Sequence, residues 1–247
     1  MKYALAISGG AARGAFALGC LHYFDESGIE IELFSGTSIG AVIASSYACG
    51  VKPKELLEIF CSKEFRKVIQ FNCLNGSLFK IDQNAGLLKK IIPIEKLEDF
   101  PKKVIVSAVD IKSGRLISFT QGDAITIVVA SCALYPMFKP ISYQDYFLVD
   151  GGVKENLPLS VLTNSALPII AINHFPYTPF NPSSLKENLK RMLYLSWYNT
   201  FEASIKHVQF NITSEQLTPL SLFGFKDLRK AFLLGYEETS KVFSKTL

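Results

Sequence analysis

The first fifty residues contain the same pattern twice: a short apolar run, a glycine turn and then a helix. Residues 2–10 pass from mostly apolar positions into two glycines, and residues 15–25 then have helical spacing of apolar side chains. Residues 31–35 form a second apolar run, which residues 36–40 join to a small-residue helix at 41–48. Two consecutive units of this kind predict parallel strands, because each helix carries the chain back across the sheet.

Apolar runs and helical patterns keep alternating to the end of the chain. Further strands are predicted at 104–109, 146–149 and 168–173, and long helices at 185–206 and 225–243. The pattern indicates an α/β fold with a mostly parallel sheet and helices on both faces. No linker, repeat or low-complexity segment interrupts it, so residues 1–247 are expected to form a single domain.

Composition excludes several classes of protein. Apolar residues make up 49% of the chain, enough for a large core, and the net charge of +4 favours anionic lipid without indicating nucleic acid. No run of about 18 apolar residues is present, so no transmembrane segment is expected and a membrane would be met peripherally, from the aqueous side. The cysteines lack metal-site spacing, which predicts reduced thiols in a cytoplasmic protein; they are Cys20, Cys49, Cys61, Cys73 and Cys132.

The sequence Gly36-Thr37-Ser38-Ile39-Gly40 lies between a predicted strand and a predicted helix. This is the setting of a nucleophile elbow, in which flanking glycines allow a sharp turn that projects the serine. Ser38 is therefore the candidate nucleophile, and the Ile39 N–H at the helix start is a candidate donor to an oxyanion. The alternative is an ordinary glycine turn before a small-residue helix.

The first glycine turn offers a second set of amide groups. Gly9, Gly10 and Ala11 bring successive N–H groups to another strand end, where they could complete an oxyanion hole, and Arg13 could add positive charge. The alternative is a dinucleotide-binding turn. The glycine spacing does not fit that motif, and no Gly-Lys-Ser/Thr follows to make a phosphate-binding loop.

A serine nucleophile needs a base, and histidine is the usual one. His22 and His207 fall within predicted helices and His174 follows a predicted strand, so none occupies a recognisable base-bearing turn. A structural role is the main interpretation for each, with His174 the best placed of the three.

Asp150 is the stronger candidate for the base. It ends an apolar strand, and Gly151 and Gly152 allow the backbone to turn sharply beside it. A carboxylate is a weak base, so it would need a dry site that raises its proton affinity. The alternative is a surface turn.

Together these residues resemble the patatin-like phospholipases, most closely the short bacterial members. The resemblance rests on three blocks in order: residues 9–14, 36–40 and 150–152. Weaker similarities at residues 110–114, 130–140 and 221–237 extend it over nearly the whole chain.

The resemblance implies a Ser38–Asp150 dyad, with the glycine-rich turn as the oxyanion hole, that hydrolyses fatty-acyl esters of phospholipids, lysophospholipids or related lipids through an acyl-enzyme. It also implies a three-layer α/β/α fold and chemistry without a metal or cofactor. One position departs from the family: Ala11 stands where a third glycine is common. Gly9 and Gly10 are therefore preferred to Ala11 as donors.

Two other functions are compatible with these residues. An acyltransferase or thioesterase would use the same serine, and a catalytically inactive paralogue would only bind lipid. Residues 63–80, which mix aromatic and basic side chains, are interpreted either as an interfacial flap or as ordinary core packing.

Overall fold

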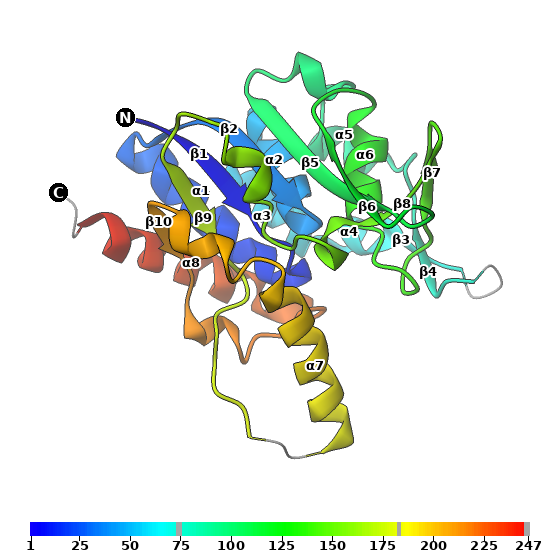
Figure 1. Ribbon diagram of the computed structural model, residues 1–247. Helices are drawn as coiled ribbons and strands as arrows, with labels where there is room; N and C mark the ends of the chain where they lie inside the picture. Colours follow the sequence, from blue (N-terminus) through cyan, green and yellow to red (C-terminus); the bar gives the residue numbers. More distant parts are fainter. Residues whose placement is uncertain (73–75, 182–183, 245–247) are drawn as a thin grey trace.

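A mixed sheet runs through the centre of the computed structural model, which describes residues 1–72, 76–181 and 184–244 (Figure 1). Its strand order is β10-β9-β1-β2-β5-β8-β7, and β6 also pairs with β5. The parallel strands are β1 (Lys2–Ile7), β2 (Glu30–Thr37), β5 (Lys103–Asp110), β9 (Ile169–Ile172) and β10 (Phe210–Ile212). The antiparallel strands are β6 (Arg115–Phe119), β7 (Ile141–Tyr143) and β8 (Tyr146–Asp150).

The helices follow the predicted alternation with the strands. They are α1 (Ala15–Ser27), α2 (Ile39–Ala48), α3 (Pro53–Cys61), α4 (Lys63–Lys67), α5 (Gly86–Ile91), α6 (Ala124–Ser131), α7 (Leu185–Asn199) and α8 (Leu228–Ser244). The predicted helix at 185–206 ends at Asn199, and a short 3-10 turn follows at Ser204–His207. No helix among the described residues is long and apolar enough to cross a bilayer.

Two strands approach each other end to end along one edge of β5. Residues 106–110 of β5 pair with β6, so β6 occupies one edge of β5. On the other edge β2 runs parallel up to the pair Thr37–Ser107, and β8 runs antiparallel from there, with Asp150 opposite Ala108. The chain leaves both strands at this junction, so the residue after Thr37 lies close to Asp150.

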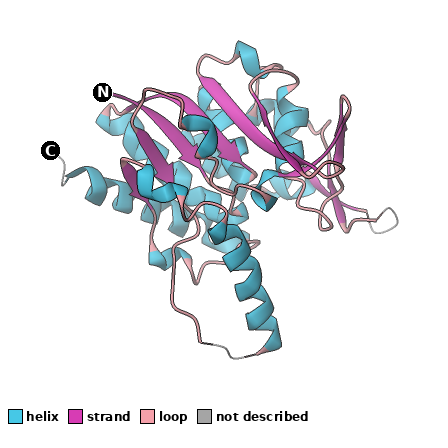
Figure 2. Ribbon diagram, viewed as in Figure 1, coloured by secondary structure: helices cyan, strands magenta, loops and turns pink. Residues whose placement is uncertain are grey.

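The core lies on both faces of the sheet, as the alternation within β1 shows. Leu5 and Ile7 point into the larger cluster, which α1, α2, α3, α6 and α8 build on one face. Ala4 and Ala6 point to a smaller cluster on the other face, formed by residues 157–175 and the segment that follows α7. Figure 2 shows helices around the central strands, and the three-layer α/β/α architecture is confirmed.

Close contact between α1 and α8 closes the larger core. A Cβ atom on Gly19 would collide with the Phe232 carbonyl oxygen, and one on Gly235 would collide with the Phe16 carbonyl oxygen. The two glycines therefore let the helix backbones touch (Figure 1). Because α1 follows directly from the first glycine turn, this packing also supports that turn.

The stretch at 63–80 is more regular than expected. It contains α4 and a hairpin of β3 (Ile69–Phe71) and β4 (Phe79–Ile81); residues 73–75 lie outside the described residues. Phe65 packs against the larger core, whereas Phe71 is 74% exposed at the hairpin. The segment therefore shows core packing at Phe65 and an exposed aromatic side chain at Phe71, of the kind an interfacial flap would have.

Replacing Gly235 with alanine is expected to lower the free energy of unfolding by about 1–3 kcal/mol, because the added methyl group forces α8 away from α1. Urea unfolding measures the effect. Gly86→Ala in α5 is the matched control, since a Cβ there meets nothing within 4 Å, and it should be neutral or stabilising by up to about 1 kcal/mol. Equal stability of the Gly235→Ala protein and the wild type would contradict the packing described.

Candidate active site

Ser38 lies at the sharp turn between β2 and α2. Its backbone has φ 55° and ψ −128°, a conformation that costs a non-glycine residue about 1–3 kcal/mol. A Cβ on Gly36 would lie 2.5 Å from the Gly40 carbonyl oxygen, and one on Gly40 would collide with the Ile7 carbonyl oxygen. The two glycines are thus needed for the turn that projects Ser38.

Hydrogen bonds to α6 hold this strained turn in place. The Ser38 N–H donates to Ser131 Oγ at 2.9 Å, and the Ser131 hydroxyl donates to the Ser107 carbonyl oxygen at 2.7 Å. Ser131 is fully buried. The turn is therefore fixed to β5 as well as to its own two elements.

Asp150 ends β8 and borders the same cavity as Ser38. Burial raises the pKa of its carboxyl group from 3.8 to about 6, while the Gly152 N–H, which donates to Oδ1 at 2.8 Å, and the Ser38 hydroxyl oppose that rise. A Cβ on Gly151 would collide with the Ser107 carbonyl oxygen, so glycine is required beside the carboxylate. The result is a buried carboxylate with raised proton affinity facing a serine hydroxyl.

Cys132 also borders the cavity beside the serine and the aspartate. Burial, and then the negative charge of Asp150, raise the pKa of its thiol far above the usual range. A thiol that keeps its proton is a poor nucleophile. Ser38 is therefore the better nucleophile of the two.

The N–H groups of the glycine-rich turn that are available as donors are not the set expected. The Gly9 N–H donates to the Asn156 carbonyl oxygen at 2.9 Å and is not free. Among the described residues, the N–H groups of Gly10, Ala11 and Ile39 have no hydrogen-bond partner, and all three residues line the cavity. The preference for Gly9 over Ala11 as a donor is thus reversed by the hydrogen bonding.

Ala11 has the backbone conformation that a glycine would adopt. Its φ is 46°, in the left-handed region that costs an L-residue roughly 1–2 kcal/mol. Ala11 therefore adds backbone strain to the glycine-rich turn.

His174 lies beneath the turn and not in the cavity lining. It is fully buried, and its Nδ1 lies 3.0 Å from the carbonyl oxygens of both Ser8 and Gly9, so the proton belongs on Nδ1. Burial lowers its pKa to about 4, which keeps the ring neutral. Since N–H and C=O point in opposite directions in a trans peptide, holding the Gly9 carbonyl here turns the Gly10 N–H away from His174.

Arg13 was expected beside the oxyanion hole, but its side chain instead binds backbone carbonyl groups. Its guanidinium is buried and donates to the carbonyl oxygens of Thr218 at 2.9 Å, Leu220 at 3.1 Å and His174 at 3.3 Å. It is not part of the cavity lining. Arg13 therefore ties the glycine-rich turn to residues 218–220, and its assignment to the oxyanion hole is corrected.

The other two histidines also lie outside the cavity lining. His22 pairs with Glu26 at 3.1 Å on α1, and His207 belongs to the 3-10 turn after α7. The described residues that line the cavity include no histidine.

Asn156 lines the cavity although the sequence patterns did not select it. Its side chain is buried, and Nδ2 has no hydrogen-bond partner among the described residues. A Cβ on Gly9 would lie 2.5 Å from Asn156 Oδ1 and 3.3 Å from Ser38 Cβ, and one on Gly152 would lie 2.9 Å from Asn156 Oδ1 and 3.1 Å from Asp150 Oδ1. The carboxamide thus borders both Ser38 and Asp150; its only sequence signal was a polar residue just before the buried Leu157 and Pro158.

The cavity has a volume of about 510 Å³ and is predominantly apolar away from these groups. Helices α3, α5 and α6, the hairpin region and the segment after α6 supply its walls. Representative lining residues are Phe60, Phe65, Ile91, Val128, Leu134 and Phe138. Such a space suits an acyl chain whose carbonyl group lies at the polar end.

Comparison with known sequences identifies related proteins. A model of the patatin-like phospholipase family matches residues 5–163. Lysophospholipase NTE1 of Scheffersomyces stipitis is 28% identical over 182 residues, which cover 68% of this chain and 11% of the relative. Lysophospholipase NTE1 of Pyricularia oryzae is 29% identical over 176 residues, 67% of this chain and 11% of the relative. This chain therefore spans about a tenth of the length of these curated relatives.

Solved structures show the same fold at low sequence identity. VipD from Legionella pneumophila has a TM-score of 0.57 and 16% identity, with 98% of this chain and 67% of that chain covered. ExoU from Pseudomonas aeruginosa, in complex with SpcU, has a TM-score of 0.51 and 12% identity, with 99% and 52% covered. The family model covers well over half of the chain and contains both Ser38 and Asp150, so the protein belongs to the patatin-like phospholipase family.

Proposed function

We propose that this protein hydrolyses fatty-acyl esters of phospholipids, lysophospholipids or related lipids, with Ser38 as nucleophile and Asp150 as base. The observation that carries the proposal is the position of a strained serine beside a buried, raised-pKa carboxylate at the polar end of an apolar cavity. The cavity suits the acyl chain, and the pair suits the ester carbonyl. Family membership agrees with this chemistry.

In the proposed first step, Asp150 accepts the Ser38 proton while Ser38 Oγ bonds to the ester carbonyl carbon. The carbonyl oxygen becomes an oxyanion, and the N–H groups of Gly10, Ala11 and Ile39, which have no partner among the described residues, are proposed to bind it. Collapse of this intermediate breaks the ester bond, and Asp150 returns its proton to the departing alcohol. The acyl group is left on Ser38.

In the second step, water takes the place of the alcohol. Asp150 accepts a proton from water as the water oxygen attacks the acyl carbonyl, and the same N–H groups bind the new oxyanion. The bond to Ser38 then breaks, Ser38 regains the proton, and the fatty acid leaves. A base with a pKa near 6 is mostly ionised at neutral pH, yet binds a proton far better than an exposed aspartate.

A fluorophosphonate probe tests for an activated serine. We expect a single adduct on Ser38 in the wild type and none in Ser38→Ala, read by mass spectrometry of the intact protein and of the labelled peptide. The Ser38→Ala variant, which forms no adduct, should also fail to hydrolyse phospholipid, lysophospholipid and glyceride esters. An adduct on another serine, or none on folded wild type, would overturn the assignment.

The raised pKa of Asp150 predicts both a pH profile and a stability effect. Hydrolysis should rise with pH through about 6 as the carboxyl group ionises. Between pH 4 and 6 the folded chain holds a proton on Asp150 that the unfolded chain has released, so this group lowers stability as pH rises, by about 3 kcal/mol in total.

Asp150→Asn removes that ionisation and is expected to abolish hydrolysis. It should match the wild type in stability near pH 4 and exceed it by up to about 3 kcal/mol at pH 7. Denaturant unfolding at both pH values measures this difference. A variant that still turns over ester, or whose stability relative to wild type is the same at both pH values, contradicts the role given to Asp150.

Asn156 is proposed to contact the reacting ester or water through its carboxamide. Asn156→Ala should lower kcat without moving the acid limb of the pH profile. Asn156→Asp places a second carboxylate beside Asp150, and like charges raise each other's pKa, so the limb should move up by about one pH unit or more. Both variants keep the backbone carbonyl that accepts from Gly9. An unmoved limb in Asn156→Asp would place the side chain away from Asp150.

A further inference from the structure

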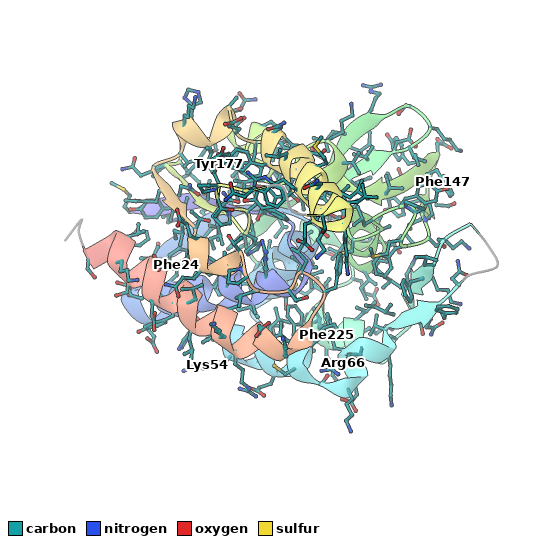
Figure 3. The ribbon with its side chains drawn as sticks, turned by 90° about the horizontal axis from the view of Figure 1, so that it is seen from below. Phe24, Lys54, Arg66, Phe147, Tyr177 and Phe225 are labelled. Atoms are coloured by element: carbon teal, nitrogen blue, oxygen red, sulfur yellow. The ribbon has the colours of Figure 1, made fainter. Side chains whose placement is uncertain are left out.

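Helix α7 extends away from the rest of the molecule. None of its 15 residues is buried. In Figure 1 the helix extends below the sheet and the other helices, and in the view from below it lies in front of them (Figure 3). Isolated helices of this length are marginal in water, so contacts elsewhere must support it.

One face of α7 is apolar and uncovered. Its exposed apolar residues follow one another at offsets of four, three and one, which places them on the same side of the helix. They are Leu185 (77% exposed), Leu189 (58%), Met192 (62%) and Leu193 (58%). We refer to these four residues as the α7 stripe.

Aromatic contacts hold the helix without covering the stripe. Tyr194 and Trp197 pack on Phe175, with ring centroids 5.6 and 5.5 Å apart, and Tyr198 packs on Phe201 at 5.3 Å. These contacts lie in the C-terminal half of α7. They set the direction of the helix and leave its apolar face in solvent.

Arg191 also anchors α7, one turn before the first of the aromatic residues named above. It stacks over the rings of Tyr177 and Tyr194, at 5.7 and 5.0 Å from their centroids. Tyr177 is seen beside α7 in Figure 3. The exposed stripe thus belongs to an anchored helix.

The stripe continues into the lining of the cavity. Trp197, one turn beyond Leu193, is part of the cavity lining, as is Phe223, which is 53% exposed. An apolar path therefore connects the α7 stripe with the cavity that contains Ser38. A partner that covers the stripe therefore lies next to Trp197 in the cavity lining.

The charges beside the stripe are mainly positive. Lys186 and Lys190 are exposed next to it, and the acidic residue of this part of the helix, Glu187, is paired with Lys190 at 2.8 Å. A helix with an apolar face and flanking lysines suits the boundary between headgroups and acyl chains. A second copy of the chain would instead bring the same positive charges to the stripe.

We propose that α7 docks this protein on an anionic lipid surface, with the α7 stripe inserted among the acyl chains and Trp197 at the point where lipid enters the cavity. The proposal rests on the proposed function, since that function makes lipid the substrate. It names the element that brings the cavity to the surface.

The chain contains a single tryptophan, Trp197, which serves as the reporter. The Ser38→Ala protein, which leaves lipid intact, is mixed with phosphatidylglycerol vesicles. We expect a blue shift of the emission and quenching by brominated acyl chains, together with sedimentation of the protein with the vesicles. The double substitution Leu189→Gln and Met192→Gln, which keeps good helix formers, should weaken vesicle binding at least tenfold.

In the otherwise wild-type background, the same double substitution should lower hydrolysis of vesicle lipid in parallel. Hydrolysis of a soluble short-chain ester and fluorophosphonate labelling of Ser38 should be unchanged. Leu233→Gln in α8 is the matched control, because Leu233 is 61% exposed on a different helix, and it should bind vesicles normally.

Unchanged vesicle binding by the double variant overturns the proposal, as does an equal loss in Leu233→Gln. Loss of binding on changing Phe71 of the β3–β4 hairpin, with α7 changes silent, would assign docking to the hairpin. A lipid-free dimer that the double substitution dissociates would show that a second copy covers the stripe. Vesicle binding without hydrolysis of any ester by the wild type would count against the proposed function and leave the docking result standing.

Discussion

The end-to-end approach of β2 and β8 on one edge of β5 is the constraint on which the site depends. Thr37 pairs with Ser107 and Asp150 with the next residue, Ala108, so the two strands leave no space for a further residue between them in the sheet. The backbone must therefore turn out of the sheet after each of these two strands. The turn after β2 projects Ser38, and the turn after β8 exposes the Asp150 carboxylate to it. The sheet therefore brings together two residues that are more than a hundred positions apart.

That arrangement is unfavourable in several ways, and neighbouring groups offset the cost. Ser38 is held at a positive φ by bonds through Ser131 to β5, and Ala11 also has a positive φ in the turn beside it. Asp150 is buried with a single backbone donor, Gly152, within hydrogen-bond distance among the described residues. Strain and an under-solvated carboxylate are typical of functional sites, and further hydrogen-bond donors to Asp150 would lower its pKa.

The sequence predicted the parts of this site that depend on local backbone geometry. The glycines around Ser38 and after Asp150 mark places where a Cβ cannot fit, and repeated strand–turn–helix units predicted that both glycine turns would share one edge of the sheet. The direction of β8 was not predictable, because an apolar run has the same pattern in either orientation. The partners of Gly9 and Arg13 were equally hidden, since they are backbone carbonyls at Asn156, Thr218 and Leu220, and carbonyls carry no sequence signal. For α7, the spacing of apolar residues predicted a helix but carried no information on what covers its apolar face.

Asn156 joins three parts of the molecule that the sequence presents separately. Its carbonyl oxygen accepts from Gly9 in the first glycine turn, its side chain borders Asp150, and its N–H donates to Thr200 Oγ1 at 2.9 Å. The Thr200 hydroxyl in turn donates to the Trp197 carbonyl oxygen at 2.7 Å, at the end of α7. A chain of three hydrogen bonds thus runs from the end of α7 to the turn that contains Gly10 and Ala11. Because the same backbone segment bonds both to the end of α7 and to the first glycine turn, with donor–acceptor distances of 2.7–2.9 Å, the direction of the helix and the position of the turn are coupled.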